Sequence, residues 1–124
     1  MSQSILYLED SDICFEVATL MLEEIGEFDI KRASSISECK NIVSANDLDQ
    51  YCLIILDIML PDGDSSVLLP LIKQQYDKPV IAFTARSGLA DIEQLKSSGF
   101  DYILPKPISF DSFKAVLASY GLPH

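Results

Sequence analysis

A continuous apolar run at residues 52–56 limits most strongly what this chain can fold into. Side chains alternate between the two faces of a strand, so an unbroken apolar run predicts a strand with both faces buried. This pattern is typical of a central strand in a parallel sheet that helices cover on both sides. The run ends abruptly at Asp57, and residues 80–83 form a second strand pattern of the same type.

The remaining segments alternate strand patterns with helical patterns. Shorter apolar strands are expected at residues 5–8, 28–30 and 102–104. A helical pattern follows each strand: one contains Ile13, Val17, Leu20 and Met21 and ends at Gly26, and the others cover residues 35–43, 67–75, 89–98 and 109–120. Pro70 lies inside the third helix, where it is expected to remove a backbone hydrogen bond and to kink the helix.

Five strands alternating with five helices predict an α/β fold, a doubly wound parallel sheet with helices on both faces. At 124 residues, of which 48% are hydrophobic, the chain can bury a core of its own, and we expect residues 1–124 to form a single domain. No apolar run approaches the ~18–20 residues that span a bilayer, so no membrane segment is expected. The N-terminus lacks the features of a signal peptide, which favours a cytoplasmic location.

The formal net charge of −10 opposes nucleic-acid binding, because phosphate contacts need clustered Lys and Arg residues. Two uses of the acidic residues stay open, a cation site and general solubility. Cys14, Cys39 and Cys52 are widely spaced within apolar segments. We expect them to be buried free thiols rather than a metal site or a disulfide.

A short set of residues, most of them polar, follows four of the strand patterns, at the edge where open α/β sheets bind ligands. They are Glu9, Asp10, Asp57, Thr84, Ala85 (the small residue of the set) and Lys106. Two carboxylates at ~5 Å repel by about 3 kcal/mol at an effective dielectric near 20, and a divalent cation relieves this repulsion. Oxygen ligands favour Mg²⁺, with Asp10 and Asp57 as direct ligands and Glu9 acting through water.

A carboxylate flanked by Mg²⁺ and an ammonium group suits phosphoryl transfer, because the incoming group meets positive potential. Asp57 is therefore the expected phosphoacceptor. Thr84 can donate its hydroxyl to a phosphate oxygen, Ala85 leaves space beside it, and Lys106 can pair with the phosphate charge. Taken singly, each residue has an ordinary structural explanation, such as a helix cap or a surface charge.

The chain resembles the receiver domain of two-component response regulators over nearly its whole length. The resemblance rests on Leu8-Glu9-Asp10, residues 57–63 (DIMLPDG), Thr84-Ala85 and Lys106-Pro107. It implies a flavodoxin-like strand order of 2-1-3-4-5 and phosphotransfer to Asp57 from a histidine kinase or a histidine phosphotransfer protein. It also implies a Mg²⁺ requirement, a metal ligand from the backbone carbonyl of Met59, a cis Lys106–Pro107 bond, and self-catalysed phosphorylation and dephosphorylation.

One position departs from the family pattern. Receivers commonly have Tyr or Phe three residues before the Lys of the last strand, where this chain has Ile103. Tyr102 is one residue away, and a shift of one residue turns a strand side chain to the opposite face, so it is not expected to substitute. Met59 and Arg86 occupy the two positions that tune phosphoryl lifetime in the family, although Arg86 is equally well explained as a surface residue.

Three classes of function follow. The first is a signalling module in which phosphorylation alters the face formed by the last helix, the last strand and the fourth helix, for binding to a target protein or an output domain. It includes a phosphorelay intermediate and a fragment of a longer regulator, and leaves phosphorylation-dependent dimerisation open. A second class, a degenerate receiver used only for docking, is favoured by Ile103 and opposed by the intact site. An aspartate-dependent hydrolase, the third, is disfavoured because Met59 stands where such enzymes place a second Asp.

Overall fold

The apolar run at residues 52–56 lies in β3 (Tyr51–Asp57), the central strand of a five-stranded parallel sheet in the computed structural model, which describes residues 3–85 and 88–123. The strand order is β2-β1-β3-β6-β7, with β1 at Gln3–Leu8, β2 at Phe28–Ala33, β6 at Val80–Thr84 and β7 at Tyr102–Pro105. Counted within the sheet alone, this is the expected order 2-1-3-4-5. The predicted doubly wound α/β fold is confirmed.

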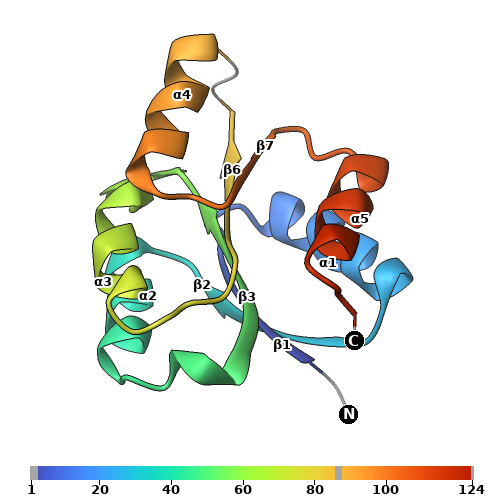
Figure 1. Ribbon diagram of the computed structural model, residues 1–124, viewed down its shortest axis with the longest axis horizontal. Helices are drawn as coiled ribbons and strands as arrows, with labels where there is room; N and C mark the ends of the chain where they lie inside the picture. Colours follow the sequence, from blue (N-terminus) through green and yellow to red (C-terminus); the bar gives the residue numbers. More distant parts are fainter. Residues whose placement is uncertain (1–2, 86–87, 124) are drawn as a thin grey trace.

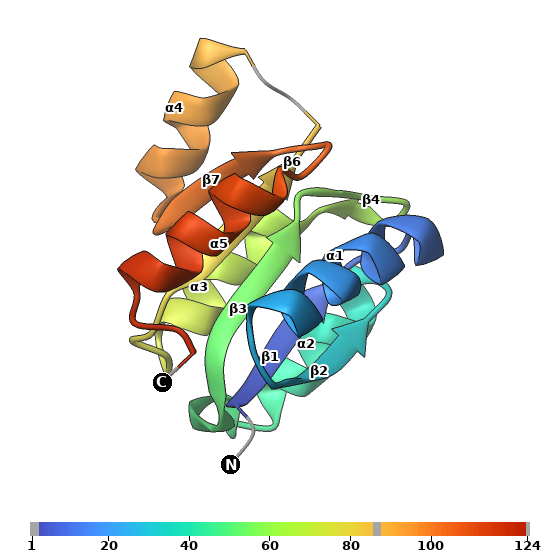
Figure 2. The same ribbon diagram turned by 90° about the vertical axis from the view of Figure 1, so that its right-hand side faces the viewer.

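Helices cover both faces of the sheet, as the buried strand patterns predicted (Figures 1 and 2). One face packs against α1 (Asp12–Ile25) and α5 (Phe110–Ser119). The other packs against α2 (Ile36–Ser44), α3 (Leu69–Lys73) and α4 (Leu89–Ser98). Two separate apolar cores result, one on each side of the strands.

Serine side chains start three of the helices. Ser11, Ser35 and Ser109 each accept a hydrogen bond from a backbone N–H in the first turn of α1, α2 and α5. Such caps satisfy donors that have no partner within the helix. By contrast, Gly88 precedes α4 and provides no side-chain cap, and Leu95 is the buried residue of this helix.

The expected helix over residues 67–75 is wrong in its extent and in the role of Pro70. The structure has a 3₁₀ turn, η2 (Ser65–Leu68), followed by the short helix α3. Pro70 lies in the first turn of α3, where its missing N–H has no partner to lose. The proline therefore helps to begin the helix and does not interrupt it.

A small hairpin follows β3 where the sequence has turn residues. It pairs β4 (Met59–Leu60) with β5 (Gly63–Asp64), and Gly63 has a φ of 135°, which favours glycine. The exposed carboxylate of Asp62 in the hairpin accepts hydrogen bonds from two N–H groups at the start of α2. A further 3₁₀ turn, η1 (Leu48–Gln50), precedes β3.

The apolar spacing in α1 predicted a helix correctly, but most of those residues do not form its buried face. Ala18 and Leu22 are the fully buried positions, whereas Ile13, Val17 and Leu20 are exposed. Apolar side chains occur on several sides of this helix, so their spacing alone does not identify the side that meets the sheet.

Both chain ends lie near the amino-terminal edge of the sheet (Figure 1). All three cysteines are free; Cys39 is buried, and Cys14 and Cys52 are partly buried. Within the described part of the chain, every helix is too short or too polar to cross a bilayer.

Candidate functional site

The strand register brings the predicted site residues together at the carboxyl-terminal edge of the sheet. Leu8 of β1 is paired with Leu56 of β3. Because the two strands are parallel, the residues that follow this pair, Glu9 and Asp57, lie side by side. Asp57 is paired with Phe83 of β6. The backbone N–H of Lys106 donates to the Thr84 carbonyl at 2.7 Å, which brings Lys106 to the same edge.

Lys106 joins the two buried acids. Its Nζ donates to Oε1 of Glu9 at 2.8 Å and to Oδ2 of Asp57 at 3.0 Å. Glu9 is 0% exposed and Asp57 is 5% exposed, so water screens these charges weakly. The Lys106–Pro107 bond is cis, as the family resemblance implied.

The two acids differ in how readily they ionise. Burial, then hydrogen bonding to Glu9 and the charge of Glu9, raise the pKa of Asp57 to about 7, although Lys106 opposes this shift. Burial also disfavours the charged form of Glu9, but hydrogen bonds with Asp57 and Lys106 hold the pKa of Glu9 below its ordinary value. Burial acts to lower the pKa of Lys106, and its bonds with both acids raise it overall. The site therefore carries an excess of negative charge that a cation would neutralise.

Asp10 completes a cluster of oxygen donors that fits a divalent cation. One carboxylate oxygen from each of Glu9, Asp10 and Asp57 lies within 4.8 Å of the others, with Asp10 on the exposed side. An all-oxygen set that is open to water on one side suits Mg²⁺, which keeps several water ligands. The Met59 carbonyl remains a predicted further ligand.

Thr84 and Ala85 are at the same edge of the sheet. Thr84 is buried at the end of β6 and lines a small cavity of about 60 Å³ together with Ile58, Asp64, Ser66 and residues of α4. Ala85 follows it and is exposed. Arg86, which the sequence placed at the rim of the site, lies outside the described residues.

Three further residues hold the site from behind, and sequence reasoning missed them. The hydroxyl of Tyr7 donates to Oε1 of Glu9 at 3.0 Å, and Nε of Arg32 donates to the backbone carbonyl of Glu9 at 3.0 Å. Ser65 Oγ donates to the backbone carbonyl of Asp57 at 2.6 Å. Only Tyr7 had a signal in the sequence, because residues two apart on a strand share one face.

Comparison with known proteins identifies the family to which this site belongs. The response regulator receiver domain family matches residues 5–118. The chain belongs to this family. Among solved structures, a two-component response regulator from Clostridium difficile superposes with a TM-score of 0.84 at 25% identity and covers 98% of both chains. A Francisella receiver domain superposes with a TM-score of 0.78 at 26% identity, over 96% of both chains.

Curated relatives of this receiver domain include longer regulators. The probable C4-dicarboxylate response regulator DctR of Halalkalibacterium halodurans is 32% identical over 117 residues, which are 94% of this chain and 50% of DctR. The transcriptional regulatory protein HprR of Escherichia coli is 35% identical over 112 residues, which are 90% of this chain and 48% of HprR. The chain thus spans about half the length of these relatives.

The departure at Ile103 has a structural consequence in this receiver domain. Ile103 is 9% exposed and packs in the core beneath α4, whereas Tyr102 is 46% exposed. The two residues point to opposite faces of β7, as predicted from the one-residue shift. The position that is commonly aromatic in the family is therefore occupied here by a buried aliphatic side chain.

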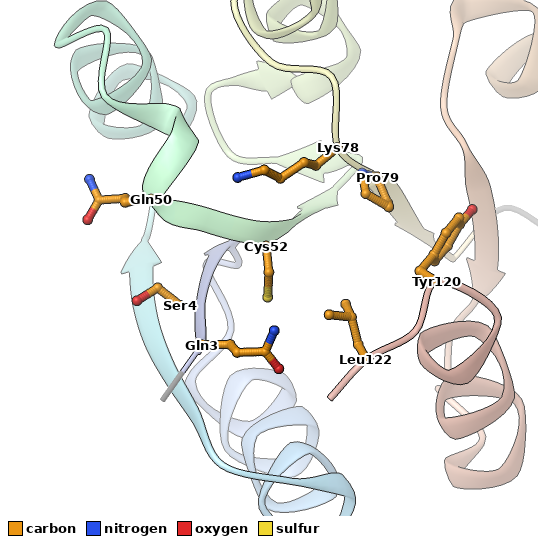
Figure 3. Close-up of a pocket in the computed structure, with 8 residues that line it drawn as sticks. All are labelled: Gln3, Ser4, Gln50, Cys52, Lys78, Pro79, Tyr120 and Leu122. Atoms are coloured by element: carbon orange, nitrogen blue, oxygen red, sulfur yellow. The ribbon is translucent and has the colours of Figure 1, made fainter. Parts of the chain in front are cut away.

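A cavity of about 470 Å³ lies at the opposite edge of the sheet (Figure 3). Cys52, Lys78, Tyr120 and Leu122 are among its lining residues. Lys78 Nζ already donates to the backbone carbonyls of Asp49 and Tyr51. This cavity has no converging set of charges comparable to the receiver site, so its size does not make it the centre of chemistry.

Proposed function

We propose that residues 1–124 form one phosphoacceptor domain, in which Asp57 accepts a phosphoryl group from a phosphohistidine. The observation that carries the proposal is the buried contact of Asp57 with Lys106, next to a cluster of carboxylates suited to Mg²⁺. The donor would be a histidine kinase or a histidine phosphotransfer protein, and we place the reaction in the cytoplasm.

The transfer exchanges one bond for another. A carboxylate oxygen of Asp57 attacks phosphorus, the O–P bond forms, and the P–N bond of the phosphohistidine breaks. The electron pair of the P–N bond returns to the imidazole nitrogen, which takes a proton from solvent. Lys106 stays protonated and pairs with a phosphoryl oxygen, while Thr84 donates its hydroxyl to another.

Glu9, Asp10 and Asp57 are the side chains that would hold Mg²⁺. Bound there, the cation supplies positive charge against the incoming phosphoryl group. The raised pKa of Asp57 makes neutralisation important, because only the carboxylate form can attack. The same groups support self-catalysed phosphorylation by small donors and later hydrolysis by water.

An apolar surface beside the site supports docking of the donor protein. A groove of about 250 Å³ runs between α1 and the segment after β7, and Ile13, Val17 and Ile108 line it together with Lys106. Ile13 and Val17 are exposed, so they are available to a partner. An apolar contact that borders the reacting residue can bring a partner histidine to Asp57.

Phosphorylation would change the affinity of the α4-β7-α5 face for a target protein or an output domain, or would promote dimerisation. Ile103 favours a second candidate, a domain that docks independently of phosphorylation, because an aliphatic side chain lacks the polar tip of a tyrosine that could exchange between solvent and core. The two candidates differ in one measurable quantity, the change in partner affinity on phosphorylation.

The test is intact-mass analysis after incubation with acetyl phosphate, with Mg²⁺ or with a chelator. We expect a Mg²⁺-dependent adduct of one phosphoryl group in the wild type and its loss in Asp57→Asn. Asp29→Asn removes an exposed carboxylate of β2 and is the matched control that keeps the adduct. An adduct that survives Asp57→Asn, or no adduct in any sample, contradicts the proposal.

A further inference from the structure

Tyr7 is a buried tyrosine whose hydroxyl contacts the acidic site. It lies on β1, is 1% exposed, and its hydroxyl donates to Oε1 of Glu9 at 3.0 Å. Two residues separate Tyr7 from Glu9 along the strand, so both side chains are on the same face of the sheet. A phenol buried at this position needs a polar partner, and Glu9 provides it.

The ring of Tyr7 is held by two other aromatic rings. Its centroid is 5.4 Å from that of Phe15 in α1 and 5.6 Å from that of Phe83 in β6, the latter edge to face. Ring contacts of this kind restrict the ring to one place. The hydroxyl is therefore a donor fixed by the core, and its direction does not depend on solvent.

Glu9 needs such a donor more than an aspartate would. A glutamate has one more rotatable bond, so fixing its carboxylate loses more side-chain entropy. Its Oε1 accepts from both Tyr7 and Lys106, whereas Oε2 accepts a longer bond of 3.4 Å from the backbone N–H of Ser11. With the tyrosine hydroxyl removed, Oε1 keeps its bond from Lys106 and Glu9 keeps its hydrogen bonding with Asp57, but the donor that the core holds in place is lost.

We infer that Tyr7 is a positioning residue, whose hydroxyl holds the Glu9 carboxylate in the orientation that the cation site requires. The inference rests on the proposed function, because it assigns Glu9 to the Mg²⁺ site. Tyr7 acts through Glu9 and has no assigned contact with the reacting phosphoryl group. Glu9 is expected to reach the cation through a bound water, and groups that orient the outer surroundings of a metal site commonly contribute 10-fold or more to metal affinity.

The test measures Mg²⁺ affinity from the rise of the thermal unfolding midpoint with Mg²⁺ concentration, since a ligand that binds only the folded state stabilises it. Tyr7→Phe keeps the ring and removes the hydroxyl, and we expect the affinity to fall about 10-fold. Tyr76→Phe is the matched control. It also removes a buried phenol, which donates to the Tyr51 carbonyl at 2.9 Å away from the site, and should leave the affinity unchanged.

A double-mutant cycle with Glu9→Asp distinguishes positioning from a general structural role. The aspartate is shorter by one carbon–carbon bond, about 1.5 Å, so its carboxylate withdraws from the tyrosine hydroxyl. Tyr7→Phe should then change Mg²⁺ affinity less than about 2-fold in the Glu9→Asp background. An equal loss in both backgrounds, or no loss in either, overturns the inference.

Failure of the proposed function gives a different result. In that case the wild type itself shows no Mg²⁺-dependent shift and gains no phosphoryl group at Asp57. If the wild type shows both and Tyr7→Phe matches it, the inference about Tyr7 is wrong while the phosphoacceptor function stands. Urea unfolding in chelator checks that Tyr7→Phe retains the fold. The Mg²⁺ affinities of Glu9→Asp and of the Glu9→Asp, Tyr7→Phe double variant provide a second measurement.

Discussion

The two edges of this sheet differ in how their charged groups are arranged. At the carboxyl-terminal edge, Lys106 is in contact with the buried acids Glu9 and Asp57. At the amino-terminal edge, a larger cavity is lined by groups such as Cys52 and Leu122, and the Lys78 ammonium donates to backbone carbonyls. At the charge-rich edge, burial and the mutual charges and hydrogen bonds of Glu9, Asp57 and Lys106 shift their pKa values, which commonly accompanies function. At the other edge, burial is the main cause of the raised pKa values of Cys52 and Tyr120. We therefore interpret the larger cavity as a packing feature between the strand starts and the end of the chain.

The two edges also differ in energy: carboxylates repel one another at the carboxyl-terminal edge, whereas the described residues of the amino-terminal edge have packing contacts and hydrogen bonds without such repulsion. Two like charges are placed side by side at the carboxyl-terminal edge, and a single ammonium group compensates them. The amino-terminal edge packs the chain ends: Leu122 is buried, and its N–H donates to the Leu117 carbonyl. Substitutions at the first edge should alter chemistry and respond to pH, whereas those at the second should alter stability alone.

The largest effect is expected from removing the ammonium group of Lys106. Lys106→Met leaves two buried carboxylates without their cation, and the free energy of unfolding should fall by roughly 3 kcal/mol in chelator. Urea unfolding measures this, and intact-mass analysis should show slower phosphorylation. Lys78→Met is the matched lysine at the other edge, where losing bonds to two carbonyls should remove only about 1 kcal/mol. Equal losses at the two sites would break the comparison.

A smaller effect is expected at the amino-terminal edge from Gly26→Ala. A Cβ on Gly26 would lie 2.7 Å from Cγ of Pro123, and because φ is 178° the penalty is steric and does not come from backbone strain. The resulting overpacking should lower the free energy of unfolding by about 2 kcal/mol without changing the phosphorylation rate. Pro123→Ala in the same chain removes the clashing Cγ and should restore part of the loss. A slower phosphorylation rate in Gly26→Ala would show that the two edges are coupled.

The sheet and the position of the site could be predicted from sequence because both depend on strand patterns. The unbroken apolar runs identified β3 and β6, and parallel strands necessarily bring the residues that follow them to one edge. Asp57 and Lys106 are 49 residues apart in the chain, yet their contact follows from this rule. The opposite orientations of Tyr102 and Ile103 followed from strand alternation in the same way.

Features that depend on which side of a helix packs, or on a rotamer, could not be predicted. Ile13 and Val17 have helical spacing but are exposed, because the sheet packs against Ala18 and Leu22. The bond from Ser65 to the Asp57 carbonyl depends on the path of the hairpin after β3, which has no pattern of its own. The prediction for Pro70 was wrong because a proline is compatible with either a break in a helix or its first turn, and the sequence did not show where this helix begins.

The smallest effect tests the stored repulsion directly, through pH. The pKa of Asp57 is raised to about 7 in the folded chain, above the ordinary value of about 3.9 for an unfolded aspartate. Between these values the folded state binds more protons than the unfolded state, so this contribution to stability is complete below the lower pKa and is lost as pH rises through the higher one. In chelator, the wild type should therefore lose stability between about pH 4 and pH 7 through this group.

Asp57→Asn removes the titrating group, so the variant should gain about 1 kcal/mol over the wild type between about pH 6 and pH 7, measured by urea unfolding in chelator. Asp29→Asn, on the exposed side of β2, should show no such pH-dependent gain. If Asp57 is the proposed phosphoacceptor, a carboxylate that destabilises its own fold is the expected trade-off for binding a cation and a phosphoryl group. If the difference between Asp57→Asn and wild type is constant with pH, the carboxyl-terminal edge stores no repulsion at Asp57, and the contrast between the edges is one of packing alone.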